Sequence, residues 1–77
     1  GRSYCPLAHA ACGKKLFVEK VFGDTAFQTK MLEQGIFPGS EITLVAGSAN
    51  CPCLLSTGDN KIMIDCASAE KILVSQK

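Results

Sequence analysis

The amino-acid sequence predicts one mainly β domain, built from five short strands, one short amphipathic helix and a short N-terminal helical turn, and closed into a small barrel. A chain of 77 residues has room for a single domain. Hydrophobic residues make up 47% of the chain, which is enough for one compact core, and the apolar runs are short and separated, as in strands. Five short strands favour a closed barrel, because closure removes exposed sheet edges.

Five segments rich in β-favouring residues, each bounded by turn residues, are the predicted strands. Between the third and the fourth, Gly58-Asp59-Asn60 has the composition of a hairpin turn, with Leu55 and Ile62 on its two sides. A helical turn over Ala67–Lys71 precedes the last strand. The predicted strands are Lys15–Val21, Glu41–Ala46, Cys53–Ser56, Lys61–Ile64 and Ile72–Ser75.

The amphipathic helix is predicted over Ala26–Gln34. Thr25 and, three residues later, Gln28 match a capping box, in which side chains bond the free amide groups of a helix start. Apolar residues then recur at helical spacing, and we expect the face that they form to pack on the core. These residues are Phe27, Met31 and Leu32.

The end of this helix carries a clear stop signal. We expect Gly35 to adopt a positive φ there, because a residue without a Cβ reaches that conformation at little cost. Ile36 then folds back onto the apolar face of the helix, as in a Schellman ending. Pro38-Gly39 is a turn dipeptide that leads into the next strand. Phe37, beside that turn, is expected to be partly exposed and available to a partner.

Charge and hydropathy exclude several kinds of partner. The 8 basic and 7 acidic residues give a net charge of +1 and form no basic cluster, so we expect no nucleic-acid binding. No apolar run approaches the roughly 20 residues of a bilayer-spanning helix, so we expect no membrane insertion. The absence of a signal-peptide pattern predicts a cytoplasmic location. Gly1-Arg2-Ser3 is typical of a processed or tagged start, so the domain is expected over residues 4–77.

The five cysteines raise the alternative of a metal site. Cys51 and Cys53, two residues apart on an extended segment, would point to the same side and could supply two thiolates to zinc or ferrous iron. The segment Pro6–Cys12 is predicted to be helical, and Cys5, His9 and Cys12 would then share one helix face. A neighbouring pair from that face could complete a four-ligand site.

The other interpretation of these residues is structural. Cysteine packs readily as a small hydrophobic residue, and His9 would then be partly exposed on a face that covers the barrel. Cys66, between Asp65 and Ala67, is interpreted as structural. On this interpretation the protein requires no cofactor.

An enzyme is not expected. The chain has one histidine, no evident pair of catalytic carboxylates and no glycine-rich phosphate loop. A cysteine nucleophile activated by His9 would need a shielded pocket, for which so short a barrel has little room.

The segment from Lys30 to Ile42 carries the most specific motif of the chain. Its core, Leu32-x-x-Gly35-Ile36-x-Pro38-Gly39, closely resembles the central signature of the ferrous iron transport protein A (FeoA) family. Pro6–Gly13 and Ala69–Val74 resemble the opening and closing motifs of the same family, so the match covers most of the chain with its spacing intact. At Asp65 this chain departs from the basic residue that is frequent in the family.

The resemblance implies an SH3-like β-barrel and a non-enzymatic, regulatory role in ferrous iron transport. Members of this family are regarded as cytoplasmic partners of ferrous iron transport protein B, a membrane permease with a GTP-binding cytoplasmic domain. We expect the partner surface near the helix and the turn after it, at Met31, Gly35, Phe37, Pro38 and Gly39. The alternative function is a metal-binding or metal-sensing module that uses Cys51, Cys53, His9, Cys12 and Cys5.

Overall fold

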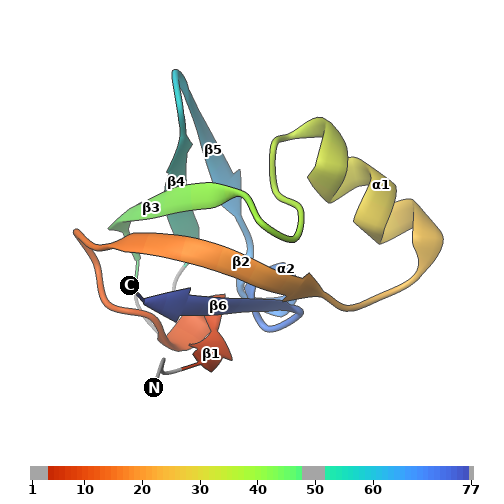
Figure 1. The fold of residues 1–77 in the computed structure, drawn as a ribbon, viewed down its shortest axis with the longest axis horizontal. Helices are drawn as coiled ribbons and strands as arrows, with labels where there is room; N and C mark the ends of the chain where they lie inside the picture. Colours follow the sequence, from red (N-terminus) through yellow and green to blue (C-terminus); the bar gives the residue numbers. More distant parts are fainter. Residues whose placement is uncertain (1–3, 48–51, 77) are drawn as a thin grey trace.

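The computed structural model of this chain describes residues 4–47 and 52–76 (Figure 1). Both α-helices in these ranges fall far short of the length that a bilayer crossing requires. In chain order the elements are β1 (Tyr4–Pro6), the short 3-10 helix η1 (Leu7–His9), β2 (Lys15–Val21), α1 (Thr25–Glu33), β3 (Glu41–Ala46), β4 (Cys53–Thr57), β5 (Asn60–Ile64), α2 (Cys66–Ala69) and β6 (Ile72–Gln76).

The strands form one antiparallel sheet in the order β1-β6-β2-β3-β4-β5. Strands β2 to β5 make a meander, β6 returns beside β2, and β1 extends the sheet beyond β6. In Figure 1, β4 and β5 cross the direction of β2 and β6, so the sheet bends strongly around the core. The mainly β fold is confirmed. The sheet has six strands instead of the predicted five, and within the described ranges no pairing joins β1 to β5, so hydrogen bonds do not close it.

The N-terminal segment differs most from its prediction. The helix expected over Pro6–Cys12 is wrong: Cys5 is extended and pairs with Val74 of β6, and the helical turn is limited to η1. Pro6, with a ψ of 147°, precedes η1, and Ala10 returns to extended backbone after it. The pairing with β6 gives this segment its backbone hydrogen bonds, which a local helix would otherwise have supplied.

Helix α1 begins one residue earlier than predicted, and its cap is a different residue. Asp24 is the N-cap, and its carboxylate accepts a hydrogen bond of 2.9 Å from the Phe27 amide. Thr25 is the first helical residue, so the capping box expected there is wrong. The side chain of Gln28 instead donates to the carbonyl of Gly23 at 3.0 Å. Asp and Thr both suit the N-cap position, and in the structure Asp24 occupies it.

The end of α1 agrees with its prediction. Gly35 has a φ of +86°, and Ile36 is fully buried. The buried face of α1 differs from the expected one, because Met31 is buried while Leu32 is 56% exposed.

The core lies inside the bend of the sheet and follows the period of two that a strand imposes. Alternate residues of β2, β3, β4 and β6 are buried, and α1, α2 and η1 cover the remaining openings. Both β2 and β3 have their predicted bounds, and the remaining predicted strands differ from the observed ones by one residue. The largest fully buried side chains are Leu7, Met31, Ile36, Ile42, Leu44, Leu55, Ile72, Val18 and Val74.

Candidate partner-binding groove

A groove of about 440 Å³ lies between α1, the end of β2 and the loop that joins α1 to β3. Apolar atoms make up most of its surface. Figure 1 shows α1 standing away from the bent sheet, with the α1–β3 loop returning toward β2 beneath it. The groove is lined by Lys20, Val21, Thr25, Gln28, Thr29, Leu32, Ile36, Phe37 and Pro38.

One stripe of α1 forms the helical wall of this groove. Its members recur at the spacing i, i+3, i+4 and i+7, which places them on one helix face. They are Thr25, Gln28, Thr29 and Leu32. Leu32 supplies the apolar end of the stripe. The neighbouring face, with Met31, packs into the core and holds the stripe in position.

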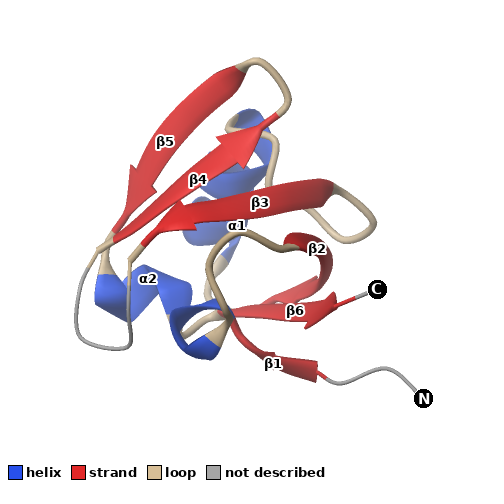
Figure 2. Ribbon diagram, turned by 90° about the vertical axis from the view of Figure 1, so that its left-hand side faces the viewer, coloured by secondary structure: helices blue, strands red, loops and turns tan. Residues whose placement is uncertain are grey.

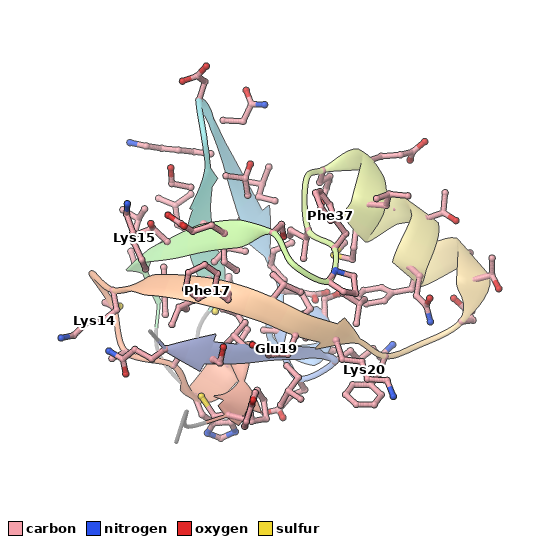
Figure 3. The ribbon with its side chains drawn as sticks, viewed as in Figure 1. Lys14, Lys15, Phe17, Glu19, Lys20 and Phe37 are labelled. Carbon is pink, nitrogen blue, oxygen red and sulfur yellow. The ribbon has the colours of Figure 1, made fainter. Side chains whose placement is uncertain are left out.

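The opposite wall is the turn at Phe37, which hydrogen bonds fix against β2. The Ser40 hydroxyl donates to the Phe37 carbonyl at 2.8 Å and accepts from the Phe37 amide at 3.2 Å. Gly39 donates to the Val18 carbonyl, and Val18 donates to the Ser40 carbonyl. This turn holds Phe37 40% exposed beside α1 (Figure 3).

A positively charged side chain, that of Lys20, lies at the groove. Lys20 lines it at the end of β2, and its ammonium lies 5.1 Å from the centre of the Phe22 ring. A cation over an aromatic face is held in a preferred position. Figure 3 shows Lys20 at the α1 end of β2, opposite the end that carries Lys14 and Lys15.

The structure puts only part of the expected partner surface at this groove. Phe37 and Pro38 line it. Met31 is only 2% exposed, so its side chain belongs to the core. Gly35 and Gly39, with φ of +86° and +94°, shape the chain on either side of Phe37.

Sequence reasoning missed the helical wall and Lys20. The signal for the wall was present, because Thr25, Gln28, Thr29 and Leu32 share one helix face. Apolar residues alone define a different helix face, and the polar members of the wall, Thr25, Gln28 and Thr29, fall outside that face.

The expected metal ligands near the N-terminus do not gather on one face. Cys5 lies in β1 and packs against the core. His9 ends η1, and its Nε2 lies 3.1 Å from a carboxylate oxygen of Glu70. Cys12 follows in a turn, and its exposed thiol donates to the carbonyl of Gly47 at 3.1 Å. The shared helix face is therefore wrong, because the helix that would have produced it is absent from this segment.

The structure instead brings Cys12 toward β4. A Cβ built on Gly47 would lie 3.5 Å from the Cys53 sulfur, so Cys12 and Cys53 both lie against this glycine. Cys53 is 1% exposed and belongs to the core, and Cys66 begins α2. Cys51 lies outside the described residues. Within residues 4–47 and 52–76, no three His, Cys, Asp or Glu side chains are grouped so that they could hold a metal ion.

Comparison with known proteins agrees with the fold. Curated protein sequences give no match. Several solved structures are similar in fold, and two of them, at 23% and 22% sequence identity, show the fold alone. One, described as the iron uptake regulatory protein FeoA, has a TM-score of 0.89 and 23% identity, and the alignment covers 97% of this chain and 100% of that one.

The second is Stenotrophomonas maltophilia FeoA complexed with zinc, described as a prokaryotic SH3 domain protein. Its TM-score is 0.75 at 22% identity, over 88% of this chain and 86% of that one. The SH3-like fold is thereby confirmed. The model of the FeoA domain matches residues 5–76, which is nearly the whole chain. The chain belongs to the FeoA domain family.

Proposed function

We propose that this protein is a cytoplasmic, non-enzymatic accessory of ferrous iron transport, which binds the cytoplasmic part of the membrane ferrous iron transporter through the α1 groove. Membership of the FeoA family supports the link to iron uptake. The S. maltophilia relative is described as a suggested activating factor of bacterial ferrous iron transport. The partner in this proposal is ferrous iron transport protein B, with its GTP-binding domain.

The observation that carries the proposal is the pair of exposed apolar side chains that line the groove. Leu32 is 56% exposed and Phe37 is 40% exposed, and both line the same apolar hollow. Exposed apolar surface of this kind marks a site of association in a soluble domain. A rigid aromatic beside a pocket is typical of the residues that dominate binding energy.

The charge beside the groove favours an acidic rim on the partner. Lys20 is held over Phe22 at the end of β2, next to the apolar walls. An apolar side chain of the transporter would fill the groove, and an acidic group beside it would face Lys20. Such charge complementarity mainly raises the rate of association and selects the orientation.

A titration of the transporter's cytoplasmic part, with and without GTP, tests this proposal. Phe37→Ala and Leu32→Ala should each weaken binding by about tenfold, the loss of an anchor residue. Val45→Ala is the matched control, because Val45 is 42% exposed on β3 and lies outside the groove. Absence of binding by the wild type, or equal losses in all three variants, would count against the proposal.

Metal binding is the second candidate, and the zinc in the S. maltophilia structure is the observation that favours it. Cys12 lies against the same glycine as Cys53, so these two thiols and that of Cys51 are the donors to test. Zinc titration of the reduced protein should be compared with Cys51→Ser and Cys12→Ser. Equal zinc content in all three proteins would remove both thiols from the ligand set. His9→Gln is the control, since His9 contacts Glu70 instead.

A further inference from the structure

Among the residues that the structure describes, the outer edge of β5 has no strand partner. Strand β5 has β4 as its neighbour on one side, and among residues 4–47 and 52–76 no strand pairs with the other side. Figure 2 shows β5 at the border of the sheet, with α1 behind β4 and β3. Natural proteins blunt such edges with charges, prolines or bulges, because an open edge accepts another strand. The register between β4 and β5 is regular, without a bulge.

The hairpin geometry identifies which backbone groups face outward. Thr57 and Asn60 close a loop of two residues, and Gly58 supplies the positive φ of +78° that such a turn needs. The closing pair exchanges two hydrogen bonds, and hydrogen-bonded and non-bonded pairs then alternate along an antiparallel ladder. The amide and carbonyl groups of Lys61 and Met63 therefore point away from β4. An extended chain could pair with them.

One large apolar side chain is exposed on β5, beside the exposed polar residues Asn60 and Lys61. Met63 is 65% exposed, the most exposed large hydrophobic side chain among the described residues. It lies opposite Leu54 of β4, which lies opposite Ala46 of β3. These three side chains form an apolar row across the outer face of the sheet, and the row ends at the open edge.

We propose that β5 pairs with β5 of a second copy of this chain, antiparallel, about a two-fold axis at Met63. The sheets of the two copies would then form one continuous antiparallel sheet. In this register Met63 lies opposite the partner's Met63, and Ile62 lies opposite the partner's Ile64. Lys61 lies opposite the partner's Asp65, an extended residue that follows the strand with a ψ of 166°. Because the axis is two-fold, the Ile62–Ile64 pair and the Lys61–Asp65 pair each occur twice. Apolar pairs and pairs of opposite charge both stabilise neighbouring strands.

Charge disfavours the two registers whose axes lie nearer the hairpin turn. An axis at Ile62 would set Asp59 against the partner's Asp65, and an axis at Lys61 would set two lysines directly opposite each other. Like charges directly opposite each other destabilise a strand pair. The Met63 axis leaves no like-charged pair between residues 61 and 65. The chain is therefore self-complementary at this edge, which favours a second copy over an unrelated segment.

Sedimentation of the protein from ~10 μM to ~1 mM tests the proposal, since a small interface of this type gives weak association. We expect concentration-dependent dimers. Met63→Glu should abolish them, and Tyr4→Glu should not. Tyr4 is the matched control, because it is 57% exposed on the other edge strand. Lys61→Glu should weaken association at least about tenfold. Melting curves of each variant establish that it is folded.

Hydrogen exchange gives a second readout that a fold defect would not mimic. The amides of Lys61 and Met63 should gain protection as the concentration rises, while those of Ile62 and Ile64 should be protected throughout.

Asp59→Asn should leave association unchanged, and would strengthen it if the axis lay at Ile62. Monomers at every concentration, or dimers without protection of Lys61 and Met63, would overturn the proposal. So would protection of these amides only when the transporter is added, which would make the occupant a transporter segment. Phe37→Ala should leave association unchanged, so this result is separable from that of the groove.

Discussion

The amide of Ile36 donates a hydrogen bond of 2.8 Å to the carbonyl of Met31, five residues before it. Gly35 donates to the Leu32 carbonyl at 3.0 Å inside this longer bond, and the two together form a complete Schellman ending of α1. Ile36 and Met31 are both buried in the same core. The end of the helix is thus fixed by backbone bonds and by packing, and it aims Phe37 into the groove.

Gly35 should be sensitive to any side chain with a Cβ. Its φ of +86° costs other residues about 1–2 kcal/mol, so Gly35→Ala should lower the free energy of unfolding by that amount. The nearest atoms to an added Cβ belong to Thr57 at 3.6 Å, an ordinary contact, so backbone conformation and not collision causes the loss. Gly35→Val should lose more, since its χ1 is also restricted.

Urea denaturation of these two variants measures the loss, with Gly35→Asn as the control that tolerates a positive φ best. A Gly35→Val protein as stable as the wild type would contradict the assigned helix ending.

Asp24 and Thr25 should respond differently to substitution, because only Asp24 caps the start of α1. Asp24→Ala should lower the free energy of unfolding by about 1 kcal/mol, because the Phe27 amide loses its acceptor. Asp24→Asn should retain most of the stability. Thr25→Ala, one residue further, should change stability by less than about 0.5 kcal/mol. Thermal melts of the three variants decide between the caps: a larger loss at Thr25 would restore the capping box expected from the sequence.

Asp65 should make stability depend on pH at acidic values. Hydrogen bonds from Ser68 hold the pKa of this carboxyl below its ordinary value of 3.8, and the charges of Lys30 and Lys71 lower the pKa further. A lowered pKa in the folded state stabilises the fold above pH 3.8, and that contribution is lost as the pH falls through the folded-state pKa.

Asp65→Asn keeps an acceptor for the Ser68 amide but removes the titrating charge. The difference in unfolding free energy between wild type and Asp65→Asn should therefore be larger at neutral pH than below pH 3.8. Urea unfolding across this range checks the difference, and parallel pH profiles of the two proteins would refute the assignment. Added salt should reduce the part that arises from the two lysines.

Two cysteines should respond differently to the same substitution. Cys53 is 1% exposed in the core, so Cys53→Ser puts a hydroxyl among apolar side chains and should destabilise by about 1–3 kcal/mol. Cys12 is exposed, and a serine there retains a donor for the Gly47 carbonyl, so Cys12→Ser should change stability by less than about 0.5 kcal/mol. Melting of the reduced, metal-free proteins provides the comparison. Equal melting temperatures would indicate that Cys53 is not a core residue.

The elements predicted best are those whose signals are local. Strand β2 and strand β3 have the bounds that their β-favouring residues and flanking turns predicted. The positive φ of Gly35 and the burial of Ile36 follow from a short motif that allows one backbone arrangement. In the candidate groove, the same motif located Phe37 and Pro38, because a turn after a helix stop holds its residues at the surface.

The sequence by itself therefore determined the mainly β class, the main strands, the helix stop and the family, because each depends on neighbouring residues. Tertiary structure alone decided that Cys5 is extended, since its hydrogen-bonding partner, β6, lies at the other end of the chain. It also decided that Met31 enters the core while Leu32 faces the groove. Both are apolar at helical spacing, and only the direction from which the sheet meets α1 distinguishes them.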